Sequence, residues 1–298
     1  MTFKKSFEIL YQTLLSDKTK QKSERVILVI SIASFLVHLT IIWLVDLRII
    51  SLHTTSDLLK NPIAAIYTPF SFILVYEVYL LIYYLPKSFT TYISKQYEII
   101  SLIIIRRLFK DLSTLSLSSD WFKINYDLQF TYDLVASVLL FFLIYQFTLQ
   151  SKKRFKTEVK NELQTERISR FIKIKKVLAT FLVPVLFLVA IYSFINWFSG
   201  AINSNVDTNV SFKNINNIFF EQFFTILIIA DVILLLFSFF HTDEFHKVIR
   251  NSGFIISTIL IRLSFSVSGL LNTVLIVSAI IFGLLIVIIH NKFEEHIV

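Results

Sequence analysis

Long apolar stretches constrain this 298-residue chain more than any other feature of its sequence. A helix needs about 20 apolar residues to cross the hydrocarbon core of a bilayer. Five stretches reach that length: residues 26–46, 64–85, 127–149, 176–197 and 217–240. A sixth run, 253–290, is too long for one helix, and polar residues and Gly269 interrupt it. We therefore divide it into spans 253–267 and 269–290.

The composition excludes several classes of protein. Hydrophobic residues make up 55% of the chain and charged residues 17%, whereas a soluble domain is about half apolar and about a quarter charged. This argues against a soluble enzyme, a disordered chain and a nucleic-acid partner. The absence of cysteine excludes disulfides and thiolate ligands. Zinc-protease, serine-hydrolase and nucleotide-binding motifs are also missing, so we expect neither catalysis nor a cofactor.

The remaining segment, 96–112, carries two arginines, and the distribution of charge decides whether it crosses. If it does, the cation-rich loop 152–176 lies on the same side as the basic N-terminus, as the positive-inside rule requires. Under this arrangement 21 of the 29 Lys and Arg residues are cytoplasmic and four are outside. The sequence therefore predicts eight spans with both termini cytoplasmic. A composition rich in Phe, Ile, Lys and Asn suggests a low-GC bacterium, and hence its plasma (inner) membrane.

Three segments lie outside the predicted spans. Residues 1–25 form an amphipathic helix, which we expect on the cytoplasmic membrane surface or docked on the protein's own helices. Residues 151–175 form a basic linker helix, which fixes the topology and could contact anionic lipid. Residues 291–298 form a cytoplasmic tail. The expected partners are membrane lipids, and a homo-oligomer is compatible with the sequence.

An internal duplication relates the two halves of the chain. Residues 99–106 and 255–262 are identical at six of eight positions, including the serine and the arginine. Upstream, both halves share the pattern Phe, hydroxyl residue, five residues, acid, Val, any residue, Leu, Leu. Because an even number of spans keeps both units in one orientation, we predict two parallel tandem four-helix repeats, 26–150 and 176–290. Chance similarity between two Ile-rich segments is the alternative.

Each repeat carries one acid and one arginine near the middle of a span. A lone charge there costs about 2.5–3.5 kcal/mol on insertion scales. Opposite charges at similar depth on consecutive antiparallel helices offset much of that cost. We therefore predict that Glu77 pairs with Arg106 and Asp231 with Arg262. Buried ionisable groups mark ion and proton pathways, although such pairs can also simply fix helix register.

Weaker polar candidates accompany these pairs. His38 could carry protons or bond a neighbouring helix, and Asp133 lies near the outer end of its span, where an acid reaches water. Ser101 and Ser257 are the matched serines of the duplication. Arg107 could pair with Asp111. The segment 241–246, His-Thr-Asp-Glu-Phe-His, could hold a metal weakly, but we favour a solvated turn and assign no metal site.

These features support an ion or proton channel or transporter that uses the paired charges. The alternative is a non-transporting scaffold or sensor, in which the pairs hold the bundle and the basic linker contacts lipid or a partner. Four glycines in the whole chain count against the first hypothesis, because filters and unwound transport helices need glycine. Paired buried charge and duplication count for it.

The topology can be tested with cysteine labelling, because the chain contains no cysteine of its own. We expect a membrane-impermeant maleimide to label Ser51→Cys in intact cells, whereas Lys153→Cys is labelled only after the cells are opened. Labelling of Lys153→Cys in intact cells would contradict the predicted orientation.

Overall fold

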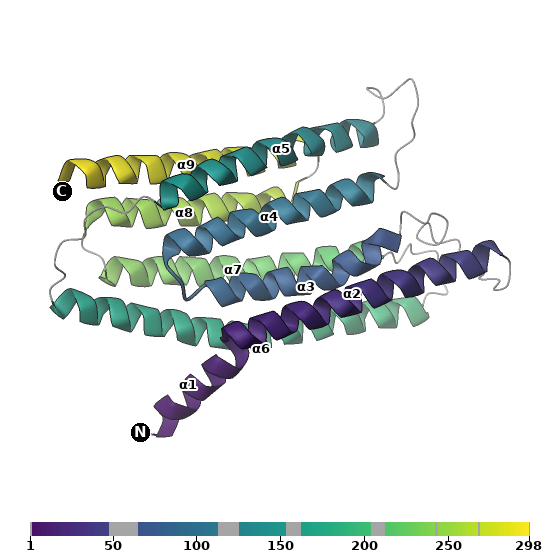
Figure 1. Cartoon of the computed structure of the whole chain (residues 1–298), viewed down its shortest axis with the longest axis horizontal. Helices are drawn as coiled ribbons and strands as arrows, with labels where there is room; N and C mark the ends of the chain where they lie inside the picture. The colour runs from purple at the N-terminus through teal and green to yellow at the C-terminus, as the bar shows by residue number, and fades with distance from the viewer. Residues whose placement is uncertain are drawn as a thin grey trace. The chain divides into compact units, whose positions relative to one another are not determined.

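The computed structural model describes residues 2–47, 65–112, 125–152, 162–203, 212–241, 244–267 and 269–297. The regular secondary structure of these residues is helical throughout (Figure 1). The helices are α1 (Thr2–Leu15), α2 (Asp17–Asp46), α3 (Tyr67–Tyr84), α4 (Phe89–Leu112), α5 (Asn125–Ser151), α6 (Glu162–Asn203), α7 (Phe212–His241), α8 (Phe245–Ser264) and α9 (Leu270–Ile297). The predicted all-α class is therefore confirmed for the described part of the chain.

Five segments of these helices are long and apolar enough to cross a membrane. They are Lys5–Asp46, Leu128–Ser151, Glu166–Tyr192, Gln222–His241 and Leu270–His296. Thr68–Tyr84 is a shorter apolar helix. Each of the eight predicted spans overlaps a helix, but α4 and α8 are not among these five segments. An α-helical membrane protein is the class that these helices support, and the number of eight spans stays a prediction.

The distribution of side chains on α5 is typical of a helix in lipid. Asp133 has no exposed surface, whereas Val138 and Phe142 are 68% and 56% exposed. Burying a charge while leaving large apolar side chains outside is unfavourable in water. In a bilayer, lipid covers the outer face and polar groups face the protein interior.

The break in the long C-terminal apolar run lies where the sequence predicts it. α8 ends at Ser264 and α9 begins at Leu270. Gly269 precedes α9 with a φ of +73°, a left-handed conformation that side chains with a Cβ rarely adopt. This glycine therefore allows the chain to turn back between two helices.

Two compact units share the chain. Unit 1 comprises Met1–Tyr83, Phe109–Leu115 and Thr180–Ile226. Unit 2 comprises Tyr84–Leu108, Ser116–Ala179 and Leu227–Val298. Helices α6 and α7 contribute residues to both units, so the units do not coincide with the two halves of the sequence. The predicted repeats 26–150 and 176–290, and the segments flanking them, stay predictions.

In unit 1, tyrosines on α3 tie this helix to α1 and α2. The hydroxyl of Tyr79 donates to the Leu14 carbonyl at 2.9 Å and that of Tyr76 to Glu24 at 3.1 Å. Tyr83 donates to Asp17. Because the three tyrosines are spaced three and four residues apart, they lie on one face of α3. These contacts therefore hold the end of α1 and the beginning of α2 against α3.

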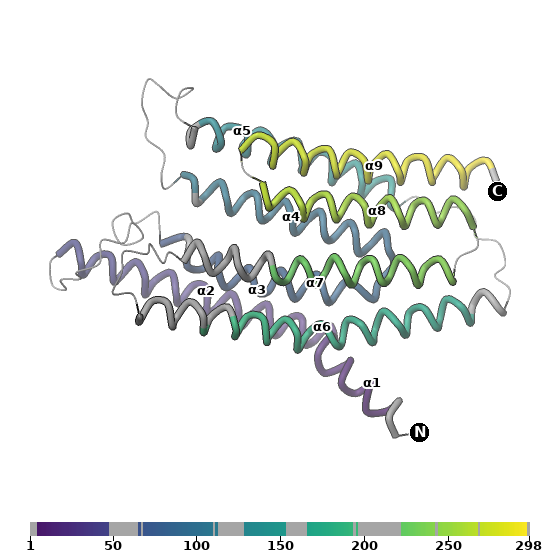
Figure 2. The backbone as a smooth tube through the Cα atoms, turned by 180° about the vertical axis from the view of Figure 1, so that it is seen from behind, coloured from purple at the N-terminus to yellow at the C-terminus, as the bar shows by residue number. Residues whose placement is uncertain are grey.

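In unit 2, α9 packs against both α8 and α5. Figures 1 and 2 view the molecule from opposite sides, and both place α5 beside α9 and α4 beside α8. Asp133 contacts Thr273, and Gln150 contacts Asn291, so α5 and α9 run in the same direction.

A close approach at Gly283 joins three helices of unit 2. The hydroxyls of Tyr97 on α4 and Ser257 on α8 are 2.6 Å apart, and Ser257 donates to the Ala279 carbonyl on α9. A Cβ at Gly283 would lie 1.9 Å from the Tyr97 hydroxyl oxygen. Only glycine leaves room for this fully buried tyrosine.

We expect Gly283→Ala to destabilise the protein by about 1–3 kcal/mol, as overpacking does in other cores. Tyr97→Phe removes the clashing hydroxyl, so the double variant should lose less stability than the two single changes combined. Unfolding of the detergent-solubilised protein measures all three variants. Strictly additive losses would show that the two positions do not interact.

Candidate functional site

A buried ion pair lies in the interior of unit 2. The Arg262 guanidinium nitrogen Nη2 is 2.7 Å from Asp231 Oδ2, and the two side chains are 3% and 0% exposed. Tyr92 donates its hydroxyl to the other carboxylate oxygen at 2.8 Å. Arg262 also donates to Gln96 Oε1 at 3.1 Å. The network thus joins α4, α7 and α8.

The pattern of α8 explains why an arginine points inward. The buried residues of this helix recur every three or four positions and define one stripe; they are Asn251, Gly253, Phe254, Ile255, Ser257, Thr258, Ile261, Arg262 and Ser264. Arg262 falls on this stripe four residues after Thr258. Its side chain therefore points into the bundle, where it meets residues of the neighbouring helices.

A second ion pair, which the sequence analysis missed, joins α4 to α5; its aspartate is fully buried and its arginine is 25% exposed. Arg107 Nε is 2.5 Å from Asp133 Oδ2, and Arg107 Nη2 donates to Oδ1 at 2.7 Å. Gln129 and Thr273 also donate to Oδ1, each at 3.0 Å. Arg107 donates further to Asn272 on α9 at 2.7 Å. The carboxylate is therefore bound by donors from three helices.

This arrangement corrects the expectation that Asp133 reaches water. The residue has no exposed surface, because Arg107 extends to it from the neighbouring helix. Sequence spacing suggested Asp111 as the partner of Arg107, whereas the bonds described above lead to α5 and α9. The sequence did contain a signal for this pair: Asp133 is an acid on an apolar helix, and such an acid is expected to pair with a cation from another helix.

Glu77 and Arg106 belong to different units. Glu77 lies on α3 in unit 1 and is 3% exposed, whereas Arg106 lies on α4 in unit 2 and is partly buried. The placement of the two units relative to each other is not determined, so the pairing of Glu77 with Arg106 stays a prediction. Of the four paired charges predicted from the sequence, the structure brings Asp231 and Arg262 together.

The weaker candidates divide between local and interhelical contacts. His38 Nδ1 on α2 is 2.5 Å from the Thr68 hydroxyl on α3, so this histidine bonds a neighbouring helix. Ser101 donates to the Glu98 carbonyl of its own helix at 2.7 Å. Ser257 instead links α4 and α9, as described above. The two matched serines therefore make different contacts.

One lysine of the predicted basic linker is buried. Lys175 is 3% exposed and donates to the Lys87 carbonyl at 2.9 Å. Its ammonium also lies 4.1 Å from the ring centroid of Phe89 and 5.0 Å from that of Phe171, which is a favourable cation–π arrangement. This residue anchors α6, so it is not available to bind lipid headgroups.

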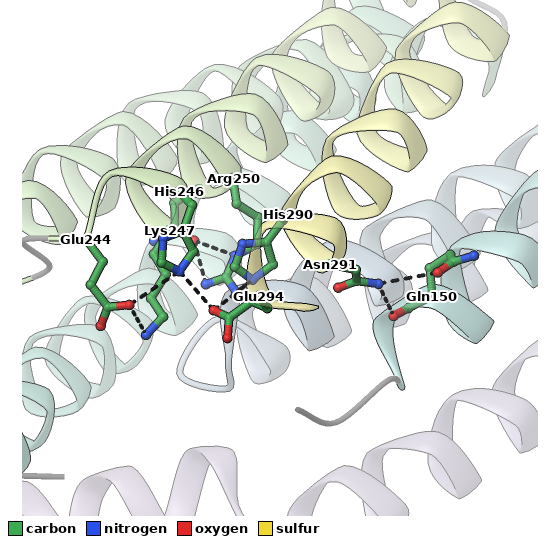
Figure 3. A network of polar contacts seen from close by, with 9 residues as sticks. Gln150, Glu244, His246, Lys247, Arg250, His290, Asn291 and Glu294 are labelled. Carbon is green, nitrogen blue, oxygen red and sulfur yellow. Dashed lines mark hydrogen bonds and ion pairs between the residues drawn. The ribbon is translucent and has the colours of Figure 1, made fainter. Parts of the chain in front are cut away.

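A polar cluster gathers where α8 begins and α9 ends (Figure 3). His246 Nε2 is 2.9 Å from Glu294 Oε1 and 3.3 Å from Glu244 Oε2. Arg250 contacts His290 at 2.9 Å. Of the histidine motif singled out in the sequence, His246 joins this cluster, whereas His241 contacts the Phe237 carbonyl of its own helix.

The comparisons with known proteins leave the family of this chain open. No protein-family model, curated protein or solved structure matches it. Its function is therefore inferred from the buried network of unit 2. That network holds two arginines and two carboxylates in an apolar bundle.

The Asp231–Arg262 pair should show strong energetic coupling. We expect Asp231→Asn and Arg262→Met each to destabilise the protein by about 3–5 kcal/mol, because each leaves a buried charge alone. The double variant should lose much less than the sum of the two. Unfolding in mixed micelles provides the measurement. The exposed pair Glu166–Arg170, 2.7 Å apart, is the matched control and should contribute less than about 1 kcal/mol.

Proposed function

We propose that this protein is an ion-translocating membrane protein and that protons move along the buried polar network of unit 2. The observation that carries this proposal is the distance over which polar contacts occur along unit 2. On α9 they involve Asn272, Thr273, the Ala279 carbonyl and His290. From Asn272 to His290 the helix rises about 27 Å at 1.5 Å per residue. The hydrocarbon core of a bilayer is about 30 Å thick.

Polar side chains occur at successive levels along this distance. Asn251 donates to Ser238 at 2.9 Å near the start of α8. The Tyr97–Ser257 contact and the Asp231–Arg262 pair lie farther along α8, and the contacts of Arg107 with Asp133 and Asn272 lie nearer the start of α9. Such groups are expensive inside a membrane, and they concentrate along the paths of ions and protons.

Protons suit this network better than hydrated ions do. Hydroxyl, carboxylate and imidazole groups can pass a proton between hydrogen-bonded neighbours without a wide aqueous pore. The chain has only four glycines, and therefore few positions where an unwound backbone could line such a pore. A proton delivered to Asp231 would neutralise its carboxylate and release Arg262, which makes this pair a natural gate.

We also propose eight spans in two parallel repeats, with both termini cytoplasmic in a bacterial plasma membrane. Contacts within unit 2 support the duplication. Helices α4 and α8 are the third of each half, and α5 and α9 are the fourth. Helix α5 runs parallel to α9 beside it, and α4 runs in the same direction as α8 (Figure 1). A two-fold axis along the membrane normal requires such parallel directions.

A scaffold or sensor role is the second candidate. The number of hydrogen bonds that the Asp133 carboxylate accepts favours it. Three residues donate to this carboxylate, so it can serve to fix helix register alone. Under this proposal the exposed cations of α6, such as Arg170 and Lys173, would contact anionic lipid or a partner protein.

Proteoliposome flux distinguishes the two proposals. Vesicles containing the purified protein and a trapped pH dye are placed under a potassium diffusion potential. We expect proton entry that the double variant Asp231→Asn/Arg262→Met abolishes, because the variant removes the carboxylate that receives the proton but leaves no unpaired charge. The control Glu166→Gln/Arg170→Met should conduct normally.

Parallel vesicles with dyes for chloride and sodium identify other translocated species. Loss of flux in a variant that elutes as a folded protein supports translocation through the network. Equal flux in the double variant and the native protein would refute this pathway. The absence of any flux in the native protein, with the fold intact, would favour the scaffold.

A further inference from the structure

Two histidines and a glutamate converge at the end of unit 2 where α8 begins. Ligand atoms of His246, His290 and Glu294 all lie within 4.8 Å of one another. The two imidazole rings stack with centroids 5.3 Å apart and planes inclined by 20°. Both Nε2 atoms face the same oxygen, Glu294 Oε1, at 2.9 Å and 3.7 Å. Figure 3 shows these side chains pointing toward a common point.

The elements that carry these residues hold them in place. His290 and Glu294 are four residues apart on α9 and therefore share one face of that helix. His246 lies in the first turn of α8, and α8 packs along α9. A second contact, from Asn291 to the Gln150 carbonyl at 2.9 Å, fixes this end of α9 against α5.

The contact with Arg250 defines the proton arrangement of His290. A guanidinium can only donate hydrogen bonds, so His290 Nε2, 2.9 Å from Arg250 Nη1, must accept one. The unprotonated Nε2 of a neutral imidazole is also the atom that binds metal ions. With Nε2 as the acceptor, the proton of the neutral imidazole is on Nδ1, which is buried and has no hydrogen-bond partner.

We propose that His246, His290 and Glu294 form a binding site for a divalent transition-metal ion, with zinc as the best-suited one. Two imidazoles and one carboxylate are a known ligand set for zinc. Glu244 Oε2, 3.3 Å from His246 Nε2, or a water molecule can supply the fourth ligand. The glutamate side chains are 19% and 43% exposed, which leaves a route for the ion to enter.

Binding would require a small rearrangement and the displacement of one cation. Ligand atoms of tetrahedral zinc lie about 3.3–3.4 Å apart, given bond lengths of about 2.0–2.1 Å. The 2.9 Å separation of His246 and Glu294 must therefore lengthen slightly, and the 3.7 Å separation of His290 and Glu294 must shorten. The metal would take the place of Arg250 at His290 Nε2. It would also interrupt the contact between His246 Nε2 and Glu294 Oε1. Arg250 already contacts Asn251 Oδ1 at 3.2 Å, so it keeps a partner when it leaves His290.

Because zinc would displace Arg250, the proposal predicts opposite changes in zinc affinity for variants of the ligands and for a variant of Arg250. Zinc affinity of the full-length protein, purified without a histidine tag, is measured by competition with a chromophoric chelator. We expect His290→Gln and Glu294→Gln each to weaken binding by at least about tenfold. Arg250→Met should strengthen it, because it removes the competing cation. His241→Gln is the matched control and should bind zinc as the native protein does.

X-ray absorption of the zinc-loaded protein provides an independent measurement. We expect two imidazole nitrogens at about 2.0–2.1 Å, and one of them should disappear in His290→Gln. Equal loss of affinity in His241→Gln, or a weaker affinity in Arg250→Met, would overturn the proposal. Binding that none of the ligand variants changes would show adventitious zinc only. Proton flux is not part of this test, so its outcome is separate from that of the proposed function.

Discussion

The interior of unit 2 is organised around charge that an apolar bundle can hold only in pairs. Each arginine and each aspartate is too costly to bury alone, so the helices that carry them must face one another at fixed depths. Asp231 orients α7 toward α8 through Arg262. Asp133 likewise fixes α5 against α4 and α9. Apolar packing gives these helices an interior, and the ion pairs determine which faces form it.

The sequence contained enough information for the class, the helices and one of the ion pairs. Apolar length predicts membrane helices directly, and Gly269 marks the break between α8 and α9 because its backbone is left-handed. The matched acid and arginine of each half suggested partners on consecutive helices. For Asp231 and Arg262 that assumption leads to residues in contact, since α7 and α8 adjoin in the chain and an arginine spans the remaining gap.

Other contacts depend on helix rotation, which spacing in the sequence does not define. An acid, Asp111, lies four residues after Arg107 in the same helix, yet Arg107 contacts Asp133 on α5. The zinc ligands come from two helices whose registers meet only after α8 and α9 have packed. Lys175 looked like one cation among many in a basic linker, but Phe89 and Phe171 enclose it. Long side chains find their partners only after tertiary packing.

The bonds between α5 and α9 have a mechanical consequence. Thr273 is attached to Asp133 near one end of the pair, and Asn291 to Gln150 near the other. Two attachments so far apart prevent either helix from sliding along the other. The two contacts therefore couple the ends of the pair, so that a shift of α5 at one end requires α9 to move with it.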